Sequence, residues 1–102
     1  MTTYISFGKW TDQAAQAIGD SPRRLDAAKR QLEEMGGRVV AFYMTMGEHD
    51  VVLVFETPDD ATAARFLLLL GSVGAVRTTT MKAFPEPAYR EIIASLRGAP
   101  AR

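Results

Sequence analysis

The chain has 102 residues, and its 12 Lys and Arg are balanced by 12 Asp and Glu. This length suits one domain, and the balanced charge does not favour nucleic acid as a partner. Because the chain contains no Cys and only one His, disulfides and thiolate sites are excluded. The residues left are too few for an ordinary zinc or non-haem iron site, so we expect no metal and no cofactor.

The first residues lack a basic segment followed by an apolar run, so we expect no signal peptide. The longest apolar stretch, residues 61–76, is interrupted by Arg65 and Gly71 and is too short to span a bilayer. The sequence therefore predicts a cytoplasmic protein without a membrane partner.

In chain order, residues 3–9 are rich in aromatic and β-branched types and predict a first strand. Thr11 or Asp12 can cap a short helical turn. Ser21-Pro22 predicts the start of a longer helix, with Ser as N-cap and Pro in the first turn. Gly36-Gly37 predicts its end. The apolar residues of this helix recur at helical spacing, at Leu25, Ala28, Leu32 and Met35.

The second half repeats this pattern. Residues 39–46 and 51–56 predict two strands joined by a hairpin at 47–50. Thr57-Pro58 predicts a second helix, with Thr as N-cap, that stops near residues 71–74. A strand over 76–84 and a short terminal helix over 89–96 complete the chain.

The order β-α-β-β-α-β-α predicts an α+β, ferredoxin-like fold, with a four-stranded antiparallel sheet and helices on one face. We expect one domain over residues 1–97 and a flexible tail over 98–102.

The strands are apolar on both faces, which a sheet covered on one face does not require. In strand 39–46, one parity gives Val39, Ala41 and Tyr43, and the other gives Val40, Phe42, Met44 and Met46. One apolar face would stay exposed in a single chain. A homodimer or higher oligomer, sheet against sheet, is therefore predicted. The alternative is a monomer whose terminal helix folds over the open face.

Several segments occur together in an order that resembles the GYD-domain family of small bacterial and archaeal proteins. They are Trp10–Gln13, Ser21–Ala28, Gly36-Gly37, Tyr43–Asp50, Pro58–Asp60, Leu70–Gly74 and Val76–Thr78. The resemblance implies a dimeric α/β-barrel fold, but it implies no activity and no catalytic residues. The sequence departs from the family at its namesake motif, because His49 stands where the family has Tyr.

The hairpin is also similar to that of the effector-binding RAM domain of Lrp/AsnC-type regulators. Those regulators carry a helix-turn-helix before this domain. Here the first strand begins at about residue 3, so we expect no such DNA-reading segment.

The candidate ligand-binding residues are Tyr43, His49, Asp50, Arg77 and Thr79. His49 can act as a base, a pH sensor or a ligand, including a proximal haem ligand, or it can be structural. Asp50 is suited to holding the turn amides, beside a Gly47 with positive φ. Arg77 and Thr79 can supply hydrogen-bond donors to a pocket, or they can keep an edge strand polar.

Arg23-Arg24 near a helix N-terminus can hold an anion, or it can be a solvated face balanced by Asp26. We find no complete catalytic set. The leading hypothesis is a non-catalytic homodimer that binds a small molecule between its sheets. The alternatives are a dimeric-barrel enzyme, such as a cofactor-free monooxygenase or an isomerase, and a purely structural oligomer module.

Overall fold

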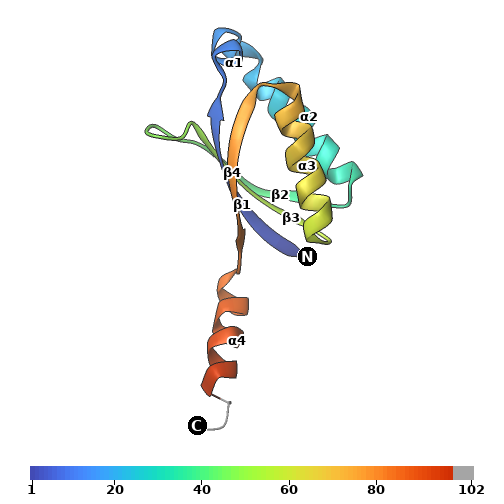
Figure 1. Ribbon diagram of the computed structural model, residues 1–102, viewed down its shortest axis with the longest axis vertical. Helices are drawn as coiled ribbons and strands as arrows, with labels where there is room; N and C mark the ends of the chain where they lie inside the picture. Colours follow the sequence, from blue (N-terminus) through green and yellow to red (C-terminus); the bar gives the residue numbers. More distant parts are fainter. Residues whose placement is uncertain (98–102) are drawn as a thin grey trace.

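The protein's structure, a computed structural model, describes residues 1–97, so the predicted flexible tail at 98–102 lies outside the described residues. Figure 1 shows the strands and helices in the expected order. They are β1 (Thr2–Trp10), α1 (Asp12–Gln16), the 3-10 turn η1 (Ile18–Asp20), α2 (Ser21–Glu34), β2 (Arg38–Met44), β3 (Val51–Thr57), α3 (Asp60–Val73), β4 (Val76–Ala83) and α4 (Glu86–Arg97).

The four strands form one antiparallel sheet in the order β2-β3-β1-β4, so β2 and β4 are its two edges. In Figure 1, α2 and α3 lie side by side against the same face of this sheet. The predicted ferredoxin-like arrangement is therefore confirmed.

The core lies between this sheet face and the two helices. Leu32 of α2 and Phe66 of α3 are fully buried against it. The Phe55 ring stacks on Tyr4 with centroids 5.2 Å apart and meets the edge of Phe66 at 5.3 Å. The predicted apolar face of α2 points inward, because Ala28 and Met35 pack on the same cluster as Leu32. Burying such side chains supplies most of the driving force for folding.

Two predicted helix caps are wrong by one or two residues. Ser21 is already helical, because η1 leads directly into α2, and Asp20 takes the cap position without a side-chain bond. Thr57 is still the last residue of β3, and its hydroxyl donates to the carbonyl of Asp59 at 2.7 Å. Asp59 caps α3 instead, because its carboxylate accepts from the Thr62 N–H at 2.8 Å.

The predicted end of α2 is confirmed. Gly36 has φ +86°, and its N–H donates to the Glu33 carbonyl, while the Gly37 N–H donates to the Leu32 carbonyl. This is the Schellman arrangement of a helix C-terminus. A Cβ on Gly37 would lie 2.5 Å from the carbonyl oxygen of Glu56, so the chain can pass this close to β3 only with glycine there.

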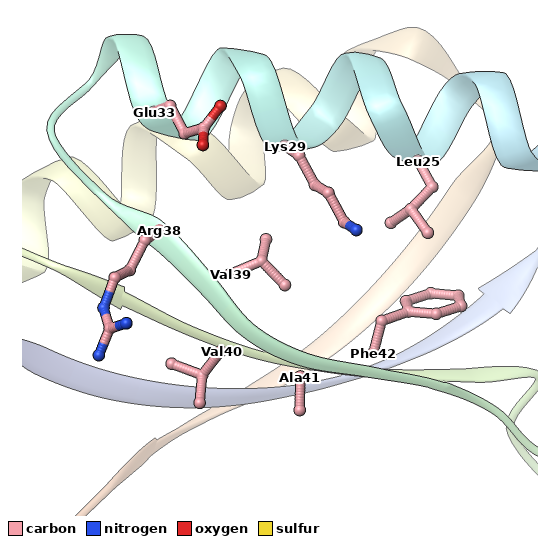
Figure 2. Close-up of a pocket in the computed structure, with 8 residues that line it drawn as sticks. All are labelled: Leu25, Lys29, Glu33, Arg38, Val39, Val40, Ala41 and Phe42. Atoms are coloured by element: carbon pink, nitrogen blue, oxygen red, sulfur yellow. The ribbon is translucent and has the colours of Figure 1, made fainter.

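The predicted division of β2 into two strictly alternating faces is wrong. The register slips between Val39 and Ala41, which leaves Val40 as an extra residue in the strand. Such a bulge shifts every later side chain to the other face. Val39 and Phe42 therefore point to the helices in Figure 2, whereas Val40 and Ala41 point away from them.

The terminal helix α4 extends away from the sheet beyond the end of β4 (Figure 1) and makes few contacts with the other elements. The alternative in which this helix covers the open sheet face is therefore not the arrangement seen. Among residues 1–97, no helix is both long and apolar enough to cross a membrane.

Candidate functional site

No helix within residues 1–97 covers the face of the sheet opposite α2 and α3, and we call this face the open face. The pairing register assigns its residues, because paired residues share a face and neighbours along a strand alternate. Tyr4, Leu53 and Phe55 are in the core, so the residues between them point outward. The open face consists of Thr3, Ile5, Phe7 and Lys9 of β1, Arg38, Val40, Ala41 and Tyr43 of β2, Val52, Val54 and Glu56 of β3, and Arg77, Thr79, Met81 and Ala83 of β4.

The centre of the open face is a row of apolar side chains that crosses all four strands. Its members are the paired residues Ala41, Val54, Ile5 and Met81. Met81 is 50% exposed, and the bulge adds Val40, which is 48% exposed, beside this row. An apolar surface of this kind is typical of an interface.

The row beyond, toward the hairpin, mixes apolar and polar groups. It runs across the sheet as Tyr43, Val52, Phe7 and Thr79. The imidazole of His49 lies against this row, because its ring centroid is 5.2 Å from that of Phe7, at an interplanar angle of 45°. The structure thus brings three predicted site residues, Tyr43, His49 and Thr79, to one end of the open face.

Asp50 has a structural contact instead. Its carboxylate accepts from the backbone N–H of Trp10 at 2.9 Å, and its own N–H donates to the Gly8 carbonyl at 2.8 Å. The expectation that Asp50 bonds an amide of the turn is therefore wrong, because the amide that it bonds belongs to β1. The reason is that β1 runs past the last residue it pairs with in β3, Val51, so the Trp10 N–H needs another acceptor.

The rest of the hairpin is held by Thr45, whose hydroxyl donates to the His49 carbonyl at 2.5 Å. Gly47 has the predicted positive φ, with a value of 159° that residues with a side chain rarely adopt. No atom lies within 4 Å of a Cβ built at Gly47. A side chain there would meet no neighbouring atom, so the cost of a substitution comes from the backbone conformation alone.

The arginine candidates are occupied elsewhere. Arg77 donates to the Gly71 carbonyl at 3.0 Å, at the C-terminal end of α3, where a cation is favourable. Arg23 pairs with the carboxylate of Asp20, and Arg24 donates to the Ala17 carbonyl at 3.1 Å. These contacts give each guanidinium a partner within the chain, so they support the structural interpretation over an anion site.

Sequence reasoning missed a polar cluster at the start of α3. The buried Tyr4 hydroxyl donates to the carboxylate of Asp60, which also pairs with the Lys82 ammonium at 3.2 Å. Burial raises the pKa of Tyr4, and the Tyr4 hydroxyl lowers the pKa of Asp60. The pKa of Asp59 is lowered by its hydrogen bonds from Thr62. A signal was available, because Asp60 stands in the first turn of a predicted helix.

Two hollows lie on the helix side of the sheet. One is a groove of about 430 Å³ between α2 and β2, shown in Figure 2. The other, of about 330 Å³, lies among α2, α3 and the sheet, where Gly8 and Ser6 leave room beneath Ala28 and Leu70. Within residues 1–97, no three His, Asp or Glu side chains gather as a metal site would require.

The chain is similar in sequence to known proteins. A family model for the GYD domain matches residues 4–93. A curated protein of Thermus thermophilus, named glutamine synthetase and cystathionine beta-lyase binding protein, is 41% identical over 86 residues, or 83% of this chain and 90% of that protein.

Solved structures show a similar fold. The crystal structure of FFRP-DM1 matches with a TM-score of 0.58 and 20% identity, over 82% of this chain and all of that one. A hypothetical protein of Pyrococcus horikoshii matches with a TM-score of 0.55 and 18% identity, over 83% of this chain and 92% of that one. At these identities the likeness concerns the fold alone.

Proposed function

The chain belongs to the GYD-domain family, and on that premise we propose that it is a non-catalytic homodimeric binding protein whose two copies pack open face against open face. The observation that carries this proposal is the central row of Ala41, Val54, Ile5 and Met81, which no helix in the described part of the chain covers. A second copy is the simplest cover, because a two-fold axis makes one surface complementary to itself.

The dimensions of the open face suit such a dimer. Four strands spaced about 4.8 Å apart, each about seven residues long at roughly 3.3 Å per residue, give a face of about 19 by 23 Å. The relief of its side chains makes the accessible area larger than this flat projection. The flat projection is about 440 Å², roughly half of the 800 Å² that each partner buries in a stable interface, so side-chain relief and neighbouring residues must supply the rest.

The proposed ligand site is the hairpin end of the open face. Tyr43, His49 and Thr79 can each donate and accept hydrogen bonds there, and Phe7 and Val52 lie between them. A second sheet above this row would enclose a pocket with apolar walls and a few polar groups, as small-molecule sites commonly are. The ligand class that fits is a small molecule with an apolar body and one uncharged polar end.

The test uses native mass spectrometry of the purified protein for a co-purified compound, and titration with the dye 8-anilinonaphthalene-1-sulfonate as a probe. His49→Tyr should change the affinity for either one at least fivefold while the melting temperature stays nearly unchanged. Glu48→Gln, on the exposed tip of the hairpin, is the matched control and should change neither. Equal affinities for all three proteins would contradict the assignment of the site.

A second candidate function is favoured by the Thermus relative, whose name describes binding to other proteins. We propose that this chain too binds a metabolic enzyme, with glutamine synthetase as the first to test. Biolayer interferometry with glutamine synthetase from the same organism would detect it, and no signal at 50 µM would reject this candidate. A cytoplasmic location stays a prediction from the sequence.

The enzyme hypothesis draws no support from the geometry. The carboxylate beside His49 in the sequence, Asp50, is engaged with the Trp10 N–H. Among residues 1–97, no carboxylate accepts a hydrogen bond from the His49 imidazole. An imidazole base usually needs such a partner to orient it.

A further inference from the structure

The two helices that cover the sheet close over it at one end and leave a space at the other. At the closed end, Leu32 of α2 and Phe66 of α3 are fully buried over Phe55. At the other end, the first turns of α2 and the last turns of α3 line the hollow of about 330 Å³, which we call the interhelix cavity. Its α3 side is open to solvent, because the lining residues Leu69 and Val73 are 44% and 72% exposed.

The interhelix cavity exists because small residues form both its floor and its roof. Ser6 and Gly8 lie on the helix-facing side of β1, and Ala28 of α2 faces them with a single methyl group. A Cβ at Gly8 would lie only 2.8 Å and 2.9 Å from methyl groups of Val51 and Val76, so a larger residue does not fit there. An unfilled space of this size costs its walls the contacts that they would otherwise make. The cavity therefore favours an occupant.

The walls of the interhelix cavity are apolar and present no free charge. In Figure 2, Leu25 and Phe42 point toward each other, and since both residues also line this cavity, they separate it from the groove of that figure. Among the described residues that line the cavity, Arg24 alone carries a charge, and its guanidinium donates to the carbonyls of Ala17 and Ala14. An ion would lose its hydration in such a space without gaining a partner, so an uncharged occupant is favoured.

Hydroxyl groups on the floor supply the polar part of the site. The Ser6 hydroxyl is 2.8 Å from that of Thr80, and Thr78 lies on the same face of β4, opposite Gly8. Ser6 and Thr78 both line the cavity. A hydroxyl can donate one hydrogen bond and accept others, so these two groups can bind a single hydroxyl or carbonyl of a ligand.

The other possible occupants lie elsewhere. The terminal helix α4 leaves the sheet beyond Ala83, about 23 Å along β4 from Val76, which lines the cavity. The second copy in the proposed dimer would cover the opposite face of the sheet. A small molecule is therefore the occupant that the position of the cavity favours.

We propose that the interhelix cavity is a second ligand site, one in each chain, for a compact uncharged molecule with an apolar body and one hydroxyl or carbonyl group. An apolar cavity of about 150 Å³ takes a benzene, so a volume of about 330 Å³ suits a body of roughly a dozen non-hydrogen atoms. This site is distinct from the hairpin end of the open face. It is complete within one chain, so binding there does not require the dimer.

The experiment is isothermal titration calorimetry of the full chain with 2-naphthol, a pair of fused aromatic rings with one hydroxyl. We expect one site per chain and a dissociation constant below about 100 µM, which is ordinary for a ligand of this size in an apolar pocket. No binding up to about 1 mM of 2-naphthol would overturn the proposal.

A variant that fills the cavity tests the location of the site. Ala28→Leu places a larger side chain at the roof, so it should weaken binding at least tenfold while the melting temperature stays the same or rises. Ala64→Leu makes the same change at an exposed position of α3 and is the matched control, with a dissociation constant expected within twofold of the native value. Equal affinities of the two variants would overturn the assignment.

A second pair of variants keeps the test independent of the filled cavity. Thr78→Val keeps the shape of the side chain but removes its hydroxyl from the cavity, and it should weaken binding of 2-naphthol at least threefold. Thr79→Val removes the neighbouring hydroxyl, which lies on the open face. A loss of affinity in Thr79→Val alone would place 2-naphthol at the hairpin end of the open face, which would overturn this inference and support the proposed function. A loss in neither variant would also overturn the inference.

Discussion

A charge at the centre of the open face should separate the dimer without unfolding the chain. Val54 is the residue of choice, because it pairs with Ile5 and Ala41 in the central row and its side chain points away from the core. In the single chain a glutamate at this position reaches solvent across the open face. In the dimer the same carboxylate would be buried without a partner.

The size of the effect follows from this difference. An unpaired buried charge costs about 3–5 kcal/mol, and a symmetric dimer contains two of them. The dimer should therefore be weakened by about 6–10 kcal/mol, or at least 10⁴-fold in its dissociation constant. A micromolar or tighter dimer would become a monomer at any concentration that is convenient to measure.

The assay is light scattering coupled to size exclusion, with the chain loaded at 1 to 100 µM. The native chain should have the mass of a dimer and Val54→Glu that of a monomer, with circular dichroism spectra of similar shape. Leu68→Glu is the matched control, because Leu68 is 75% exposed on α3, away from the open face, and should leave the dimer intact. If Val54→Glu keeps the dimer mass at 1 µM, the interface lies elsewhere and the reasoning fails.

Three further predictions concern stability. Asp50→Ala should lower the free energy of unfolding by about 1–3 kcal/mol in urea titrations, because it leaves the backbone N–H of Trp10 without its acceptor, whereas Asp50→Asn should recover most of the loss. Gly37→Ala should destabilise by about 1–3 kcal/mol, because its Cβ would meet the β3 backbone, whereas Gly19→Ala meets nothing within 4 Å and should be neutral; equal urea midpoints would refute the packing argument. The folded-state pKa of Asp60 is below its usual 3.8, so the stability that its ionised form supplies is present above that pH and is lost as the pH falls further. The melting temperature should therefore drop between pH 5 and pH 2.5, and it should drop by less in Asp60→Asn.

The helices and strands could be predicted from local pattern, because each is specified by residues close together in the chain. The Gly36-Gly37 stop and the apolar spacing of α2 are of this kind. The sequence predicts the wrong caps for α2 and α3, because Ser21 and Thr57 are favoured cap types, as are Asp20 and Asp59, which take these positions. What displaced them was the neighbouring element, the turn η1 in one case and the end of β3 in the other.

The candidate site also combines features that the sequence predicts with features that depend on how the strands pair. The sequence alone indicated that both sheet faces are apolar and that Tyr43, His49 and Thr79 are candidates. Which face is open was decided by the pairing register and by the bulge at Val40, since one extra residue reverses the side of everything after it.

The sequence alone therefore predicts the fold and the excess of apolar strand surface, because short-range spacing specifies them, and its motifs resemble those of the family. The three-dimensional structure was needed to show that His49 lies against Phe7, that the Asp50 carboxylate accepts from the Trp10 N–H, and that α4 extends away from the sheet. Each of these depends on contacts between residues about 40 positions apart or on the path of a whole helix. No local pattern encodes such contacts, because they are set by how the strands pair and where the helices pack.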